Sequence, residues 1–362
     1  MNEKERDLIL PIIAAGGAGI AIFPVAPLLG SALLFAVGTW GIKYYREHGK
    51  LAGVFRNCGI VNKDGQIAQL REKKRIDGGI MYRYSLPPGF CVNDVIRRQD
   101  AIEGFLGKTV SIKSQIKDAV IEVYDSDIEK YDFELTPWLE IGRGRGGKPV
   151  KLDFATFPHL LIAGESGSGK STLLRALICN MLLGKTKCKL SLVDLKGGTE
   201  CGIFRKHPRV AHFARTQREA EAVINAFAAE IDRRYEEFFQ SGVISGNVEP
   251  WYLIIDEFAE LEETDVMTTV KSIAARGRAA GCNMIISTQR PDAKILEGGI
   301  KANLTSVVGF KTANRVNSEI VLGVSGLERM KGQGNGVFKC AGEFTEFQAP
   351  YLSEKRAREL IG

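Results

Sequence analysis

The segment that most constrains the fold of this chain reads FPHLLIAGESGSGKSTLL, from Phe157 to Leu174. It predicts a short apolar strand over 159–163, a glycine-rich turn that matches G-x-x-x-x-G-K-S over 164–171, and an apolar-rich helix over 172–183. Glycines allow the backbone of such a turn to curl, so that consecutive N–H groups point at phosphate oxygens at a helix N-terminus. A strand before the turn and a helix after it indicate a phosphate-binding P-loop.

The residue types after the turn indicate the ligand. Lys170 supplies a point charge for the β- and γ-phosphates, and the Ser171 hydroxyl is a ligand for Mg²⁺. The pattern therefore predicts ATP and Mg²⁺ as cofactors. The residues expected to cradle the nucleotide are Gly164, Glu165, Ser166, Gly167, Ser168, Gly169, Lys170, Ser171 and Thr172.

A P-loop needs an acid on a neighbouring strand, and the run WYLIIDE over 251–257 supplies two. Its apolar residues are typical of a buried parallel strand, which places Asp256 at the carboxyl edge of the sheet. We expect Asp256 to hold the Mg²⁺ shell and Glu257 to act as general base toward the attacking water. An ordinary helix cap is the alternative role for such a pair. Gln289 follows a further strand and is expected to sense the γ-phosphate.

The remaining pattern of this half favours an α/β fold. Strands are predicted over 189–194 and 283–288, with a long helix over 217–239 between them. Alternating strands and helices indicate a predominantly parallel, doubly wound sheet.

The first half of the chain has a different character. No charged residue occurs from Leu8 to Ile42, a run of 35 residues that would extend about 50 Å as one helix, against roughly 30 Å of hydrocarbon. Pro24 and Pro27 interrupt it near its middle. Residues 1–48 are therefore expected to form a transmembrane helical hairpin; a single tilted span or a re-entrant hairpin is the alternative. A secretory signal and a buried hairpin of a soluble domain are further alternatives.

Charge predicts the orientation of that anchor. The stretch 43–100 holds 12 Lys and Arg against 6 Asp and Glu, whereas residues 1–42 carry a net charge of −1. Because Lys and Arg are retained on the cytoplasmic side, we expect a cell-membrane protein whose large C-terminal domain is cytoplasmic.

Residues 49–141 are predicted to form a small α+β domain next to the membrane. The ranges 78–86 and 110–124 alternate like strands, and 93–106 is typical of a helix. Its basic residues are expected either to contact phosphates or lipid headgroups, or to form a solvated charged face: Arg71, Lys73, Lys74, Arg75, Arg97 and Arg98. A flexible Gly/Arg linker is expected over 142–148, before the large domain at 149–362.

Composition narrows the function classes. The chain of 362 residues has a net charge of only +6, so contact with nucleic acid must come from local basic clusters. Its seven cysteines include no pair two residues apart, which is typical of reduced thiols. The four histidines show no metal-binding spacing, so we expect no metal site made of side chains alone.

Five segments, PHLLIAGESGSGKS, LVDLKGG, LIIDEFAEL, RAAGCNMIISTQRPD and ILEGGIKANL, occur in this order within 157–323. Together they resemble the motor domain of the FtsK/SpoIIIE family of DNA translocases. The resemblance implies a RecA-like fold, a ring that is typically hexameric, and ATP-driven movement of double-stranded DNA through its pore. The layout of the membrane-proximal part resembles members of Gram-positive conjugative elements and plasmids, which act as coupling proteins.

Two features of the family are assigned less directly in this chain: the arginine donated across the subunit interface and the residues that contact DNA. Family translocases commonly have an arginine where this chain has Glu319, so the arginine donated across the subunit interface is expected to be Arg315 or Arg278. The resemblance places the DNA-contacting loops near 197–209 and 294–301. Their candidate phosphate contacts are Lys294, Lys301, Arg205, Lys206 and Arg209.

These observations favour a membrane-anchored, ring-forming DNA pump of conjugative transfer, with a relaxase and secretion-channel proteins as its expected partners. Segregation of chromosomes or plasmids at the division site is one alternative, but the chain stops at Gly362 without the winged helix of segregating members, which favours conjugative transfer. A protein-export ATPase is another, although exporters usually carry motors in tandem. A scaffold without activity is disfavoured because Lys170, Ser171, Asp256 and Glu257 are intact.

Overall fold

The computed structural model describes residues 50–115, 117–243, 248–261, 266–291 and 299–362. The predicted hairpin at 1–48 lies outside them. Among the helices within these ranges, none combines the length and the apolar character needed to cross a membrane. The chain divides into two compact units, Met1–Asp127 and Ile128–Gly362, which are described separately.

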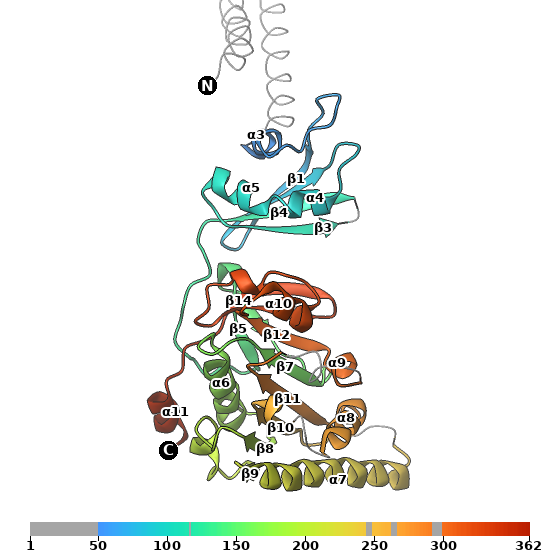
Figure 1. The fold of residues 1–362 in the computed structure, drawn as a ribbon, viewed down its shortest axis with the longest axis vertical. Helices are drawn as coiled ribbons and strands as arrows, with labels where there is room; N and C mark the ends of the chain where they lie inside the picture. Colours follow the sequence, from blue (N-terminus) through green and yellow to red (C-terminus); the bar gives the residue numbers. More distant parts are fainter. Residues whose placement is uncertain (1–49, 116, 244–247, 262–265, 292–298) are drawn as a thin grey trace, which may run out of the picture. The chain divides into compact units, whose positions relative to one another are not determined.

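The described part of the first unit contains a four-stranded antiparallel sheet in the order β1-β2-β4-β3 with three helices (Figure 1). Its core is formed by side chains such as Phe55, Tyr84 and Ile121. The helix expected over 93–106 is two helices, α4 and α5. The elements are α3 (Lys50–Asn57), β1 (Gln69–Ile76), β2 (Gly79–Ser85), α4 (Val92–Ile96), α5 (Gln99–Leu106), β3 (Val110–Gln115) and β4 (Asp118–Tyr124).

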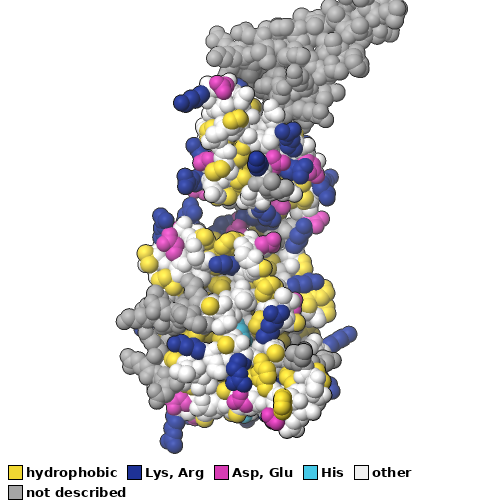
Figure 2. Space-filling model, turned by 90° about the vertical axis from the view of Figure 1, so that its right-hand side faces the viewer, with side chains coloured by type: hydrophobic (Ala, Val, Ile, Leu, Met, Phe, Trp, Pro, Cys, Tyr) yellow, Lys and Arg dark blue, Asp and Glu magenta, His cyan; other side chains and the backbone are white. Residues whose placement is uncertain are grey.

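Four of the basic residues lie on β1, at one edge of this sheet. Lys73 Nζ lies 5.7 Å from the centre of the Tyr82 ring, and Arg71 Nε donates to Ser85 Oγ at 3.0 Å. Lys and Arg side chains of this unit are interspersed with Asp and Glu on the face that Figure 2 shows. This arrangement agrees with a solvated charged face, and charge on an edge strand also opposes pairing with another sheet.

The second unit contains a ten-stranded sheet in the order β6-β5-β14-β13-β12-β7-β11-β10-β8-β9 (Figure 1). The six strands from β12 to β9 are parallel, and β13, β14, β5 and β6 join them antiparallel. The α/β class is as predicted, but the sheet is mixed. Its strands are β5 (Glu140–Gly144), β6 (Pro149–Lys151), β7 (His159–Ala163), β8 (Lys189–Asp194), β9 (Val210–Ala214), β10 (Trp251–Asp256), β11 (Cys282–Thr288), β12 (Ser306–Phe310), β13 (Asn335–Cys340) and β14 (Glu343–Gln348).

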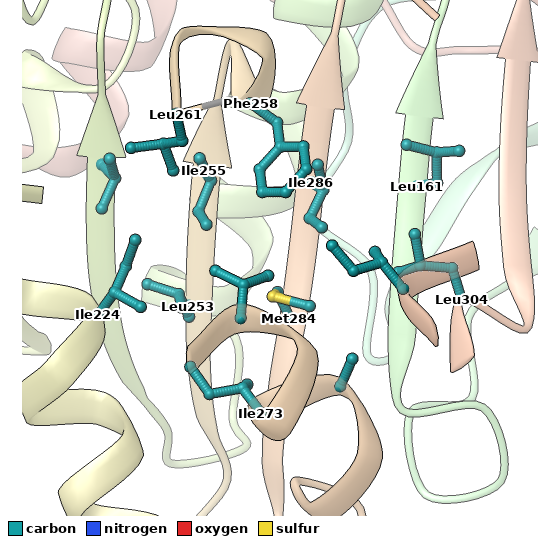
Figure 3. Close-up of a cluster of buried hydrophobic side chains, with 14 of the residues drawn as sticks. Leu161, Ile224, Leu253, Ile255, Phe258, Leu261, Ile273, Met284, Ile286 and Leu304 are labelled. Carbon is teal, nitrogen blue, oxygen red and sulfur yellow. The ribbon is translucent and has the colours of Figure 1, made fainter. Parts of the chain in front are cut away.

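Helices cover both faces of the parallel strands. On one face, Leu253 and Ile255 of β10 pack with Met284 of β11 against Ile224 and Ile273 of two helices (Figure 3). The alternate residues of β10 point into a second core on the opposite face. Burial on both faces explains the unbroken apolar runs. The helices are α6 (Lys170–Leu183), α7 (Gln217–Ser241), α8 (Val266–Arg276), α9 (Gly299–Asn303), α10 (Arg315–Leu322) and α11 (Glu354–Ile361), with 3₁₀ turns η1 (Arg145–Gly147), η2 (Gly202–Phe204), η3 (Phe258–Leu261) and η4 (Leu327–Arg329).

The structure corrects the linker predicted at 142–148. This stretch belongs to β5 and η1, and Gly144 and Arg143 pair with Phe347 and Gln348 of β14. A Cβ on Gly142 would lie 2.1 Å from the Gln348 carbonyl oxygen, so the glycine permits a close approach of two strands rather than flexibility. The boundary between the two units falls between residues 127 and 128 of the sequence, and not near residue 141 as expected.

Candidate nucleotide site

The glycine-rich turn joins β7 to α6, as the sequence predicts. Gly169 has a φ of 124°, and a Cβ there would lie 2.6 Å from Gly334 Cα, so both the dihedral and the space require glycine. The Gly334 N–H donates to the Ser168 carbonyl at 2.8 Å. The turn is therefore fixed against the segment that enters β13.

Lys170 begins α6 and is almost fully buried. Its Nζ donates to the Glu165 carbonyl oxygen across the turn, at 2.7 Å. Burial, with a smaller contribution from the Lys196 ammonium, lowers the pKa of Lys170 to about 8. The loop therefore holds a partly desolvated cation against its own backbone, ready to pair with an anion.

Asp256 and Glu257 lie where β10 ends, at the same edge of the sheet. Asp256 is 1% exposed, and burial raises its pKa even though the Lys196 charge acts in the opposite direction. Glu257 has a φ of 56°, a conformation that costs a residue with a Cβ roughly 1–2 kcal/mol. Backbone strain of this kind is typical of functional sites.

Glu257 is held by the end of the neighbouring strand. Its Oε1 accepts hydrogen bonds from the Gln289 N–H at 3.1 Å and from Thr288 Oγ1 at 3.3 Å. Gln289 also lines the same cleft as Lys170. The structure thus brings together the predicted lysine, both acids and the predicted glutamine.

Two residues of this site were given no role from the sequence. Asp194, which ends β8, pairs in register with Asp256, and Lys196 Nζ lies 3.4 Å from Asp256 Oδ2 and 3.2 Å from Glu257 Oε2. Both belong to the segment LVDLKGG. The signal available was that this segment also ends a strand at the carboxyl edge.

The cleft next to the P-loop has a volume of about 740 Å³. One wall contains Ser171 and Thr172, and another is formed by segments distant in sequence, among them Tyr131, Gln333 and Tyr351. Lys130 donates to Gln333 Oε1 within this wall. The backbones of Asp132 and Tyr351 form an isolated parallel β-bridge. No sequence motif identifies these residues.

The oxygen atoms in the cleft and directly behind it fit a hard cation. The Asp256 carboxylate is buried beside Glu257, and Ser171 lies in the cleft, so the available ligands are oxygens, which Mg²⁺ prefers. Within the described ranges, no three His, Cys, Asp or Glu side chains cluster as a metal site. Mg²⁺ bound through one or two protein oxygens and the nucleotide phosphates does not need such a cluster.

The two candidate arginines lie at opposite edges of the sheet. Arg315 begins α10, which follows β12, and the pairing of Gly309 with Ala163 places that end of β12 beside the P-loop. Its side chain is 74% exposed, with Nε 2.7 Å from Glu319 Oε1. Arg278 instead lines a second hollow of about 1050 Å³, together with residues that precede β8, β10 and β11.

The candidate DNA contacts differ in how free their side chains are. Arg205 and Lys206 are exposed beyond η2, and Arg205 Nη1 donates to one carbonyl oxygen, that of Gly202, at 2.8 Å. Arg209, in contrast, uses Nη1 to donate to the carbonyl oxygens of Met181, Gly184 and Thr186, so it caps the carboxyl end of α6. A contact between Arg209 and phosphate stays a prediction, and its Nη1 has a structural role as well. Lys294 and the side chain of Lys301 lie outside the described part of the chain.

A strand, P-loop and helix, paired acids on the parallel neighbour and helices on both faces define a P-loop ATPase domain. Residues 135–253 match the model of the FtsK/SpoIIIE family, which agrees with this class.

Relatives and solved structures agree with this assignment. The chain is 32% identical over 244 residues to DNA translocase FtsK of Clostridium acetobutylicum, covering 61% of this chain and 32% of the relative. It is 29% identical over 243 residues to DNA translocase SftA of Bacillus subtilis, covering 61% of this chain and 25% of the relative. The chain thus spans about a third or less of the length of these relatives.

Two solved structures resemble the fold. The pCW3 conjugation coupling protein TcpA, in a monomer form with ATPγS, has a TM-score of 0.60 and 24% identity, and the match covers 88% of this chain and 98% of that one. The cytoplasmic domain of the type VII secretion ATPase EccC of Thermomonospora curvata has a TM-score of 0.53 and 25% identity, with 65% and 32% covered.

Proposed function

We propose that this chain is an ATP-driven motor that moves double-stranded DNA, anchored in the cell membrane by residues 1–48 with its motor domain in the cytoplasm, and that it serves as a coupling protein in conjugative transfer. The observation that carries the ATPase part is that Lys170, Lys196 and Gln289 line one cleft, and that the buried acids Asp256 and Glu257 contact it through Lys196 and Gln289. DNA as substrate follows from the translocase relatives.

The chemistry assigned to each residue follows from its position. The backbone N–H groups of the P-loop and Lys170 bind the phosphates, and Ser171 with Asp256 would hold Mg²⁺, which withdraws charge from them when it is bound. Glu257 takes the proton of the attacking water. Gln289 lines the cleft at the end of β11, so its side chain is positioned to report loss of the γ-phosphate to the loop that follows β11.

A ring, typically hexameric, would place a second subunit against the cleft. Arg315 is our choice for the arginine donated across that interface, because its exposed guanidinium lies at the same sheet edge as the P-loop. Its ion pair with Glu319 would have to open for this role. Arg278 remains the alternative.

Conjugation is proposed over segregation because the likeness to the coupling protein TcpA extends over 88% of this chain, well beyond the motor. A relaxase and secretion-channel proteins are the partners this role implies. Genes for a relaxase next to this one would support the proposal, whereas genes for division machinery would favour segregation.

The likeness to EccC supports a second candidate, in which the motor moves a polypeptide. One assay separates the two. We expect duplex DNA to increase ATP turnover of the full-length chain severalfold and a secreted polypeptide to leave it unchanged. Glu257→Gln is expected to bind ATP and DNA but to hydrolyse slowly. Stimulation by the polypeptide alone would overturn the DNA assignment.

A further inference from the structure

Lys196 holds a position between the two catalytic acids that the proposed ATPase role does not explain. Its Nζ lies 3.4 Å from Asp256 Oδ2 and 3.2 Å from Glu257 Oε2, and its side chain is 26% exposed, within the nucleotide cleft. A lysine paired with two carboxylates, one of them almost fully buried, is an electrostatically strong arrangement.

The backbone beneath Lys196 is fixed while its side chain reaches into the cleft. The buried Asp194 carboxylate accepts from the N–H groups of Lys196, Glu200 and Cys201 at 3.2, 2.8 and 2.7 Å. Glu200 is in turn paired with Arg175 at 3.0 Å. The turn after β8 is therefore anchored, and the long side chain of Lys196 is the part that can move.

Two lysines face the two catalytic acids of the site. Asp256 and Glu257 contribute two negative charges, and Lys170 and Lys196 contribute two positive ones. The Lys196 ammonium lies within 3.4 Å of an oxygen of each carboxylate. A divalent cation held by the same carboxylates would face the Lys196 ammonium as a like charge at short range, in a poorly solvated site.

We propose that Lys196 is a displaceable counter-ion, which neutralises Asp256 and Glu257 in the empty site and withdraws when Mg²⁺ and nucleotide bind. The inference rests on the ATPase role proposed above. Its consequence is that Lys196 weakens Mg²⁺ at the site and, until the site is loaded, occupies the Glu257 oxygen Oε2 that would otherwise meet water.

The test measures how strongly Mg²⁺ changes the affinity for nucleotide. This is a binding measurement and needs no hydrolysis. Binding of a fluorescent, non-hydrolysable ATP analogue to the full-length chain is measured with saturating Mg²⁺ and with excess chelator. Lys196→Met removes the charge and keeps most of the length. The quantity compared is the dissociation constant with chelator divided by the dissociation constant with Mg²⁺. We expect this ratio to rise about tenfold in Lys196→Met, because binding with Mg²⁺ tightens and binding without it weakens.

Two further variants control for charge and position. Lys196→Arg keeps the charge, and its ratio is expected to stay within about twofold of wild type. Lys130→Met removes the same charge from the opposite wall of the same cleft, where the lysine bonds to Gln333 rather than to an acid. We expect it to change both dissociation constants equally and to leave the ratio unchanged.

Other results would overturn the inference. An equal loss of affinity in both conditions for Lys196→Met would make Lys196 a direct phosphate ligand, and an unchanged pair of constants would make its contacts structural. If Lys196→Met does not fold, Lys196→Gln, which retains a polar end, is measured with the same criteria. Absence of nucleotide binding in the wild-type chain would instead refute the proposed ATPase role.

Discussion

The parallel and antiparallel parts of the ten-stranded sheet both reach the nucleotide cleft, but they contribute different things to it. The parallel strands end in the charged groups, Lys170 through the P-loop and Asp256 and Glu257 after β10. The antiparallel strands contribute uncharged groups, such as Gln333 and Gly334 before β13 and Gln348 at the end of β14.

This difference follows from the direction of the strands. Parallel strands all end at one edge, so the residues after them collect there, together with the N-terminus of the following helix. Antiparallel strands present alternating ends and cannot gather charge in this way. We conclude that the parallel part supplies the chemistry and the antiparallel part shapes the wall, and four predictions test this division.

The largest effect is expected from the parallel part. Lys170→Ala removes the cation that faces the phosphates, and we expect ATP turnover to fall about 100- to 1,000-fold while the fold is retained. Steady-state turnover and the thermal unfolding midpoint check this. Turnover close to that of wild type would mean that the P-loop of this chain does not carry the reaction.

A smaller effect is expected from the wall. Gly334→Ala places a Cβ 2.6 Å from Gln348 Nε2, at a φ of 90°, and displaces the segment that binds the P-loop. We expect nucleotide affinity to fall roughly tenfold, about 1.4 kcal/mol, and the turnover of the saturated enzyme to change little.

Gly332→Ala is the matched control for this variant. It shares the left-handed dihedral, but its nearest neighbour would be Lys311 Cδ at an ordinary 3.7 Å. Equal losses of nucleotide affinity in the two variants would mean that backbone strain at the left-handed dihedral causes the effect. The contact between Gly334 and Gln348 would then not shape the cleft.

At the opposite edge, the parallel part has a structural role. Arg209→Met removes three hydrogen bonds to the carboxyl end of α6, and we expect the free energy of unfolding to fall by about 1–3 kcal/mol. Lys206→Met, a nearby exposed lysine, is expected to change it by less than about 0.5 kcal/mol. Urea denaturation measures both. If Arg209→Met instead weakened DNA binding at unchanged stability, Arg209 would act as a phosphate contact and not as a helix cap.

The smallest effect concerns pH. Because the pKa of Lys170 is about 8 in the empty site, its charge is lost as the pH rises through 8, and we expect nucleotide affinity to fall roughly threefold between pH 7.5 and 8.5. Stability has the opposite sign: a lysine whose pKa is lowered on folding is buried at a cost while charged, so the free energy of unfolding rises above pH 8.

Equilibrium titrations across this range check both signs. Lys170→Met supplies the control for stability, since the increase above pH 8 should be absent from it. An affinity that stays constant up to pH 9 would show that phosphate binding does not depend on the Lys170 charge.

The sequence predicted the parts of the second unit whose signals are local. β7, β8, β10 and β11 are runs of buried apolar residues, and the helix expected over 217–239 is α7. Lys170, Asp256, Glu257 and Gln289 were found because each lies just beyond such a strand. The position of polar residues directly after apolar strands therefore predicted both the central strands and the charged residues of the site.

The rest depends on pairing between distant residues, which one sequence does not reveal. β5 contains three residues, Gly142, Arg143 and Gly144, that look like a linker until β14 pairs beside them. Lys196 is 60 residues from Asp256, and Tyr131 and Tyr351 meet only through the fold. The basic run 71–75 likewise shows no alternation of apolar residues, although it forms most of β1.

The hydrogen bond from Gln289 to Glu257 comes from the peptide N–H and not from the glutamine side chain. Substitution at position 289 therefore leaves the group that orients the base in place. For the motor role proposed above, hydrolysis and its communication to the rest of the motor are consequently genetically separable: a Gln289→Ala enzyme is expected to consume ATP without converting it into movement. In the proposed ring, such uncoupled subunits would reveal how many working subunits a translocation step requires.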